Sequence, residues 1–248
     1  MADFQIEIAG CTVQIRSLFE STRDYCRRYF SENTPTLFLT VTHPELEQEQ
    51  QLLLEEARQE GIRPRRFPDP FLERSILQRK LAQALIDRDI LLLHGSTVAV
   101  DGRAYLFTAP CGTGKSTHTR LWREVFGSRA IMVNDDKPFL RFTQEGVLAC
   151  GAPWSGKHGL DTNITVPLAG ICLLARGTEN RIMPADRESL LPLLLHQACP
   201  PQEDRQHGHF QALVARLCST VPLWQMECTK NPQAACVAFA AMSGEKQP

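Results

Sequence analysis

The stretch from Tyr105 to Trp122, YLFTAPCGTGKSTHTRLW, joins three features that together could bind phosphate groups. Its first residues are apolar and aromatic, as in a buried strand, its middle carries closely spaced glycines, and a helix is predicted to begin near Lys115. A strand, a glycine-rich loop and a helix that starts with lysine and serine form the context that a phosphate-binding loop requires. The alternative, a loop whose glycines only permit a tight bend, leaves the lysine and serine unexplained. The stretch therefore predicts a nucleoside triphosphate site.

The loop follows the pattern G-x-x-x-x-G-K-[ST] except at one position, where Ala109 replaces the first glycine. Glycines bring backbone N–H groups close to phosphate oxygens, and the N-terminus of the next helix adds free donors and a positive dipole end. The lysine would reach the β- and γ-phosphates, and the Ser116 hydroxyl would bind Mg²⁺. The residues predicted to hold the nucleotide are Cys111, Gly112, Thr113, Gly114, Lys115, Ser116 and Thr117.

Two adjacent carboxylates, Asp135 and Asp136, follow an apolar strand predicted at 130–133. Asp135 lies 135 − 115 = 20 residues after Lys115, enough chain for one helix and one strand to return to the same edge of a sheet. Phosphoryl transfer to a hydroxyl needs charge neutralisation and an acceptor for the hydroxyl proton. Adjacent side chains on extended backbone point to opposite sides, so we expect one aspartate at the metal and the other at the proton. Two solvated aspartates in a turn are the alternative.

The elements that must position these residues are read from apolar periodicity and turn signals. Residues 1–70 are predicted to form a small α+β unit, in which 62–70 is a proline-rich linker, and residues 71–248 to form the nucleotide-binding domain. A hairpin turn at Asp101-Gly102 directly before the glycine-rich loop indicates a mixed sheet. In the second domain, strands are predicted at 90–94, 98–100, 104–108, 130–133, 139–142, 147–150, 167–174 and 221–228, and helices at 71–87, 115–126, 188–198, 210–218 and 232–242.

The composition sets broad limits on the class of protein. With 248 residues, of which 43% are hydrophobic and 22% charged, the chain can bury one substantial core or one core with a smaller appendage. A net charge of −1 gives no electrostatic footprint for nucleic acid or for an anionic membrane. The basic cluster at 63–66 is too short to change this and is expected to be a solvated loop.

The cysteines and histidines do not predict a metal site. The nine cysteines are scattered without a C-x-x-C pair, as in proteins of a reducing compartment. The close pair His207 and His209 falls in a segment predicted to be a polar loop, where exposed histidines are expected rather than zinc ligands. No secretory signal pattern is present and no apolar run reaches about 18 residues, so we expect a soluble protein of the cytoplasm.

Four motifs in order, 93–95 (LHG), 105–117 (YLFTAPCGTGKST), 133–137 (VNDDK) and 151–153 (GAP), resemble the HPr kinase/phosphorylase and phosphoenolpyruvate carboxykinase-like family. The resemblance covers about residues 75–175. It implies an α/β fold in which a P-loop nucleotide-binding core with a mixed sheet stands beside the small N-terminal unit. Kinases of this family transfer phosphate to a serine hydroxyl on a carrier protein, a peptide or a small molecule.

The resemblance also implies roles for individual residues. His94 is expected near the phosphates, Lys115 and Ser116 at the phosphates and Mg²⁺, Asp136 as general base, and Asp135 as its neighbour on the metal side. The chain departs from HPr kinases after the sheet, where 154–163 (WSGKHGLDTN) replaces their glutamate-containing signature. The loop 151–163, with Lys157 as its cation, is expected to recognise the acceptor; an ordinary glycine-rich connection is the alternative.

The motifs favour an enzyme, a kinase that uses ATP and Mg²⁺ to phosphorylate a serine-like hydroxyl on a protein, peptide or small molecule. A nucleotide-binding regulatory or scaffold protein without turnover is the alternative. Two adjacent carboxylates favour the enzyme, because nucleotide binding alone has less need of the second one. The sequence leaves open the acceptor, the choice of ATP over GTP or pyrophosphate as donor, and the oligomeric state.

Overall fold

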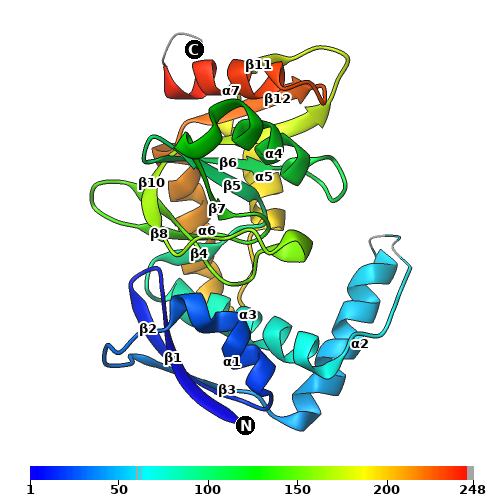
Figure 1. The fold of residues 1–248 in the computed structure, drawn as a ribbon, viewed down its shortest axis with the longest axis vertical. Coiled ribbons are helices and arrows are strands. Elements are labelled where there is room, and N and C mark those ends of the chain that lie inside the picture. Colours follow the sequence, from blue (N-terminus) through cyan, green and yellow to red (C-terminus); the bar gives the residue numbers. More distant parts are fainter. Residues whose placement is uncertain (60, 62, 245–248) are drawn as a thin grey trace. The chain divides into compact units, whose positions relative to one another are not determined.

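Two sheets, one in each of two compact units, organise the structure (Figure 1). The computed structural model describes residues 1–59, 61 and 63–244. The chain divides into two compact units, Met1–Ala84 and Leu85–Pro248. The domain boundary predicted near residue 70 stays a prediction. Ile62, the first residue of the predicted linker, lies outside the described residues.

The first unit contains a sheet of order β1-β2-β3, formed by β1 (Ala2–Ile8), β2 (Cys11–Ser17) and β3 (Leu37–Thr40). β1 and β2 form an antiparallel hairpin, and β3 pairs with β2 in parallel. Ala9 and Gly10 join the hairpin with φ angles of 52° and 77°, as a two-residue turn of the primed type requires. The helices of this unit are α1 (Glu20–Cys26), α2 (His43–Gln59) and α3 (Asp69–Ile86), whose last two residues belong to the second unit.

Glu73 of α3 is a buried carboxylate that fixes the start of α1. It accepts hydrogen bonds from the N–H groups of Leu18 and Phe19 and from the Thr22 hydroxyl, the last at 2.5 Å. N–H groups at the beginning of a helix have no partner within that helix. Glu73 therefore supplies acceptors that the local sequence of α1 lacks.

In the described part of the chain, nine strands form the sheet of the second unit, in the order β4-β8-β9-β10-β6-β5-β7. β12 pairs with β10, and β11 pairs with β12. β10 runs parallel to β6 and to β12, and the other pairs are antiparallel, so the sheet is mixed as the sequence predicts. The strands are β4 (Ile90–Leu92), β5 (Ser96–Val100), β6 (Arg103–Thr108), β7 (Ala130–Asn134), β8 (Phe139–Phe142), β9 (Val147–Cys150), β10 (Thr165–Arg176), β11 (Arg181–Pro184) and β12 (Leu223–Cys228).

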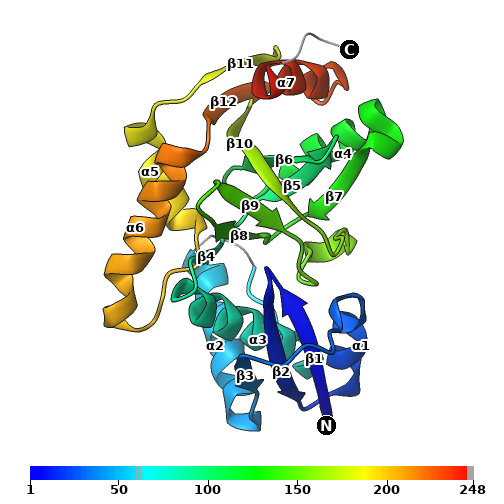
Figure 2. The same ribbon diagram turned by 90° about the vertical axis from the view of Figure 1, so that its left-hand side faces the viewer.

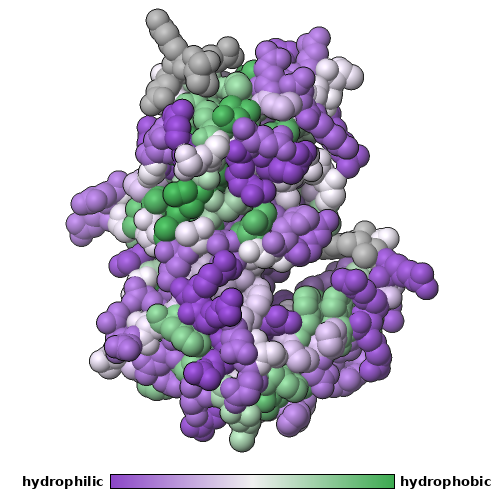
Figure 3. Space-filling view, in the orientation of Figure 1, coloured by the Kyte–Doolittle hydropathy of each residue, from purple (hydrophilic) through white to green (hydrophobic). Residues whose placement is uncertain are grey.

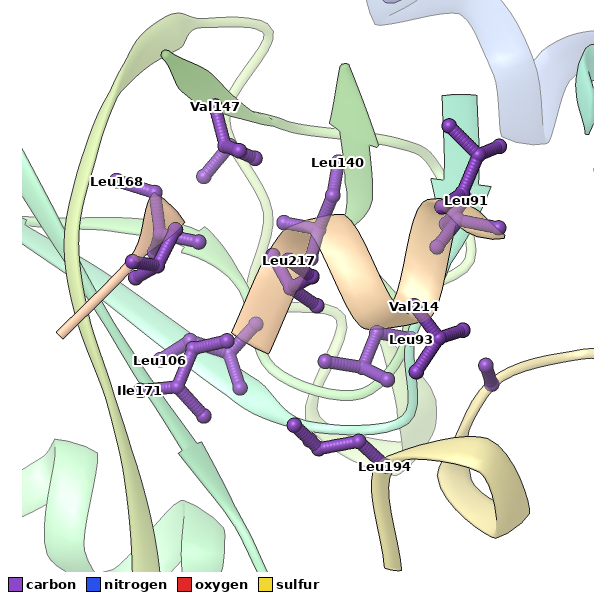
Figure 4. Packing of buried hydrophobic residues seen from close by; sticks show 14 of the residues in the cluster. Leu91, Leu93, Leu106, Leu140, Val147, Leu168, Ile171, Leu194, Val214 and Leu217 are labelled. Carbon is purple, nitrogen blue, oxygen red and sulfur yellow. The ribbon is translucent and has the colours of Figure 1, made fainter. Parts of the chain in front are cut away.

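Helices cover both faces of this sheet: α4 (Lys115–Phe126) and α7 (Gln233–Ser243) lie on one, and α5 (Arg187–Gln197) and α6 (Asp204–Thr220) on the other (Figure 2). Alternate residues of β6 enter the two resulting cores. Tyr105 and Phe107 pack with Trp122 of α4, whose ring centroid lies 4.9 Å from that of Tyr105. Leu106 packs on the opposite side, in a cluster with Leu217 of α6 and Leu194 of α5 (Figure 4).

The prediction of a helix at 210–218 was short at its N-terminus, because α6 begins at Asp204. His207 and His209 therefore lie on a helix and not in a loop. Gln206 is buried and donates a hydrogen bond to Asp87 Oδ2 at 2.8 Å, which anchors a first turn whose other residues are polar.

Hydrophilic residues predominate on the face shown in Figure 3, with apolar residues in small patches between them. Across the described residues, every helix is too short or too polar to cross a lipid bilayer.

Candidate functional site

The loop that joins β6 to α4, residues 109–114, is named here the β6–α4 loop. Gly112 and Gly114 have φ angles of 74° and 123°, a region that favours glycine. A Cβ at Gly112 would meet no atom within 4 Å, so the loop is open on that side. Among the described residues, no side chain caps the N-terminus of α4, which leaves the N–H groups of its first turn without side-chain acceptors. This arrangement suits an anionic ligand.

Lys115, the first residue of α4, is largely buried behind the loop. Its Nζ donates a hydrogen bond to the carbonyl oxygen of Ala109 at 3.0 Å. Burial lowers the pKa of Lys115, while the neighbouring Cys111, Asp136 and Asp135 act in the opposite direction. The lysine and the two aspartates, separated by about twenty residues in the chain, therefore lie within electrostatic reach of one another.

His94 and Asp136 lie together beside this lysine. Nε2 of His94 is 3.4 Å from Oδ1 of Asp136. Burial lowers the pKa of His94 to about 4, and Lys115 and Lys137 act in the same direction, so the imidazole is neutral near pH 7. Burial also raises the pKa of Asp136, against the opposing effect of the same two lysines. Asp136 thus has the character of a carboxylate that accepts a proton more readily than an ordinary aspartate.

Asp135 has different surroundings from its neighbour. Its side chain is buried, and Oδ1 accepts a hydrogen bond from the Ser96 hydroxyl at 2.6 Å. The Ser96 hydroxyl is also hydrogen-bonded to that of Thr119 on α4, at 2.7 Å. Asp135 is therefore linked through two buried hydroxyls to the helix that carries Lys115.

Asn134 organises the turn that holds both aspartates, and sequence reasoning gave it no role. Its Oδ1 accepts hydrogen bonds from the N–H groups of Asp136 and Lys137, at 2.9 and 2.7 Å. Its Nδ2 donates to the carbonyl oxygens of Ala152 and Trp154, at 2.8 and 3.2 Å. An asparagine at the end of a strand indicates such a turn. Its hydrogen bonds to the 152–154 segment could not be predicted from the local sequence, because they depend on how the chain folds.

Gly95, the residue that follows His94, packs against the turn that holds the two aspartates. Its N–H donates to the carbonyl oxygen of Asp136 at 2.8 Å. A Cβ at this position would lie 2.9 Å from Leu106 Cδ2 and 3.0 Å from the carbonyl oxygen of Phe107. The glycine therefore permits a close approach that a larger residue would prevent.

The loop 151–163 returns to the same place. A Cβ at Gly156 would lie 3.1 Å from Cβ of Asp136, so this part of the loop packs directly against the aspartate. The Ser155 hydroxyl donates to Asp161 Oδ2 at 2.7 Å inside the loop. Lys157 is exposed next to Gly156, and its predicted role in acceptor recognition stays a prediction.

Arg176, at the end of β10, holds the other side of the β6–α4 loop. Its Nη2 donates to the carbonyl oxygen of Gly112 at 2.6 Å, and its Nε lies 3.4 Å from that of Thr113. The arginine lies in the walls of two hollows, of about 650 and 170 Å³. No local pattern in the sequence predicts this role of Arg176, because its partners are backbone carbonyls of another segment.

The predicted magnesium ligands are Ser116 and Asp135. Within the described residues, no group of three or more His, Cys, Asp or Glu side chains is placed to hold a metal ion. Mg²⁺ in kinases is held by one or two protein oxygens together with waters and substrate phosphates, and a serine hydroxyl and a carboxylate are oxygen ligands of that kind. The donor set fits a metal shared with a bound triphosphate, and the assignment stays a prediction.

Comparison with known proteins gives similarities in structure and none in sequence. The chain matches no protein-family model and no curated protein. Among solved structures it is similar to the HPr(Ser) kinase/phosphatase from Coxiella burnetii, with a TM-score of 0.37 and 14% identity. The match covers 62% of this chain and 99% of that chain. A similarity of this degree does not establish a shared activity.

Proposed function

We propose that the chain is a Mg²⁺- and ATP-dependent kinase that phosphorylates a serine-like hydroxyl on a protein, a peptide or a small molecule. The observation that carries the proposal is the convergence of Lys115, His94 and Asp136 beside the open, glycine-bearing β6–α4 loop. Catalysis of phosphoryl transfer consists mainly of positioning and charge stabilisation, which such a set of groups supplies.

The binding part of the proposal rests on the loop and on Lys115. The N–H groups of residues 111–117 would donate to phosphate oxygens, and Lys115 would leave the Ala109 carbonyl for the β- and γ-phosphates. Ser116 and Asp135 would hold Mg²⁺, which when bound neutralises charge on the phosphates.

The chemical part rests on Asp136. The acceptor hydroxyl oxygen forms the bond to the γ-phosphorus, its proton passes to the Asp136 carboxylate, and the bond from the γ-phosphorus to the bridging oxygen breaks. The raised pKa of Asp136 suits a proton acceptor. Neutral His94 can donate one hydrogen bond to a phosphate oxygen or to Asp136. Lys157, exposed beside Gly156, is proposed to contact the acceptor, and the scattered cysteines support a reducing compartment such as the cytoplasm.

A screen of hydroxyl-bearing proteins, peptides and metabolites with γ-³²P-labelled ATP tests the proposal. We expect label on an acceptor with the wild-type chain and its loss with Asp136→Asn. The matched control is Asp204→Asn, which changes an exposed aspartate at the start of α6. Label transfer that survives Asp136→Asn would contradict the role of the base. Tight nucleotide binding without transfer to any acceptor would favour a regulatory protein without turnover.

A further inference from the structure

A hollow of about 170 Å³ adjoins the β6–α4 loop and is named here the α4 hollow. One wall is formed by Thr117, His118 and Leu121 of α4, and the other by Cys228, Thr229 and Lys230 at the end of β12. Ligand pockets commonly run to about 300–1,000 Å³, so this hollow suits part of a larger ligand. It continues from the residues at which the proposed function places phosphates.

His118 lies in this wall, and its two ring nitrogens have different surroundings. It is 2% exposed, and its Nε2 accepts a hydrogen bond from the indole N–H of Trp122 at 3.1 Å. In the neutral ring the proton must then reside on Nδ1. Nδ1 is buried and, within the part of the chain that the structure describes, has no hydrogen-bond partner. Buried donors of this kind are rare and costly, so a ligand atom that reached this N–H would supply the acceptor that it lacks.

The opposite wall is held in place before any ligand arrives. The N–H and the hydroxyl of Thr229 both donate to Asn180 Oδ1, at 2.8 and 3.1 Å. The N–H of Asn231 donates in turn to the Thr229 hydroxyl at 3.1 Å. Lys230 is exposed, and it lines the hollow together with the apolar side chain of Leu121. The hollow thus combines a fixed wall, an apolar surface, one buried donor and one cation.

We propose that the α4 hollow takes the base of a purine nucleoside triphosphate whose phosphates lie on the β6–α4 loop. A purine is flat and largely apolar, and its N7 accepts hydrogen bonds, as the His118 N–H requires. A cation such as Lys230 is attracted to the face of an aromatic ring. Inorganic pyrophosphate or tripolyphosphate bound at the β6–α4 loop would place no aromatic base in the hollow. The inference rests on the proposed function for the place of the phosphates, and it adds a site for the base of the nucleotide.

Calorimetric titrations with Mg²⁺·ATP and with Mg²⁺·tripolyphosphate test the inference, because the two ligands share the phosphate chain and differ in the nucleoside. We expect wild type to bind ATP more tightly than tripolyphosphate. His118→Phe keeps the aromatic ring and removes Nδ1–H, and we expect it to weaken ATP about 3- to 10-fold while leaving tripolyphosphate unchanged. Because His118→Phe also removes the partner of Trp122, the exposed Lys230→Ala is a second variant, and it should lower the preference for ATP in the same way.

The control for Lys230→Ala is Arg103→Ala, which removes an exposed cation from the far end of β6 and should leave both affinities unchanged. A preference for ATP that both variants retain in full would overturn the inference. Equal affinity of wild type for ATP and tripolyphosphate, with both lost in Lys115→Ala, would overturn it while leaving the phosphate site in place. Binding of neither ligand would overturn the inference and the proposed function together.

Discussion

Asp135 and Asp136 are neighbours in the chain, yet the structure gives them different surroundings. Asp135 is tied to the Ser96 hydroxyl in the interior, whereas Asp136 lies beside neutral His94 with about a third of its side chain exposed. A carboxylate held among hydroxyls and close to Lys115 suits a metal ligand, and one with a raised pKa at a partly open position suits a base. Removing the charge of each aspartate is therefore expected to change a different property of the reaction.

Replacing each aspartate by asparagine separates these roles. Asp136→Asn should keep nucleotide and Mg²⁺ binding and lower the transfer rate about 10²–10⁴-fold, the usual contribution of a general base. Asp135→Asn should instead raise the Mg²⁺ concentration needed for activity, because a negative oxygen leaves the metal shell. The transfer rate is measured against Mg²⁺ concentration for both variants. If raised Mg²⁺ rescues Asp136→Asn and fails to rescue Asp135→Asn, the roles are reversed.

The pH dependence of transfer provides a separate test of Asp136. A base must be deprotonated to act, and burial raises the pKa of this carboxyl above the ordinary value of an aspartate, about 3.9. As pH falls through the raised pKa, kcat/KM should fall with it, at a higher pH than an exposed aspartate would produce. Asp136→Asn should remove this acid limb. An unchanged acid limb in the variant would assign it to another group.

At the scale of elements, strand directions explain why distant residues meet. β6 runs parallel to β10, and β7 has the same direction because both it and β6 pair antiparallel with β5. The carboxyl ends of β6, β7 and β10 therefore share one edge of the sheet, where ligands of open α/β sheets bind. The residues that follow these ends are the β6–α4 loop, the aspartate turn and the segment after Arg176.

Gly151→Ala tests whether the loop 151–163 is fixed to this edge. A Cβ at Gly151 would lie 1.9 Å from the carbonyl oxygen of Thr162 and 3.1 Å from that of Val133, so the backbone must move. We expect a loss of about 1–3 kcal/mol in the free energy of unfolding, from denaturant titration, and a loss of transfer activity. The control is Gly208→Ala on α6, where a Cβ meets no atom within 4 Å and alanine favours the helix. Equal stability of Gly151→Ala and wild type would show that the loop is not held as described.

Elements with local signals could be predicted from the sequence, and those that depend on remote partners could not. Helix α4 was predicted with the bounds that the structure has, because a glycine precedes it and another follows it. β11 was missed because it is a short strand whose pairing partner, β12, lies far along the chain. The same holds for side chains: spacing placed Lys115 and the aspartates in one candidate site, but Arg176 is recognised only through carbonyls 63 and 64 residues away in the chain.

At the scale of the whole molecule, all residues of the candidate site belong to the second unit. The first unit, Met1–Ala84, carries no residue of the predicted site, and its sheet and helices form a separate compact body. We therefore expect the second unit to hold the nucleotide and to perform transfer. No role is assigned to the first unit, and every test of activity therefore uses the full chain.

Binding of Mg²⁺·ATP to the full chain, measured by isothermal titration calorimetry beside the Lys115→Ala variant, decides whether the β6–α4 loop is a nucleotide site. We expect wild type to bind one Mg²⁺·ATP per chain. Lys115→Ala should bind at least about tenfold more weakly, because it loses charge-assisted hydrogen bonds to the β- and γ-phosphates, while unchanged circular dichroism shows that it remains folded. No heat of binding with wild type, or equal affinity in the two proteins, would contradict the assignment of the loop and with it the kinase.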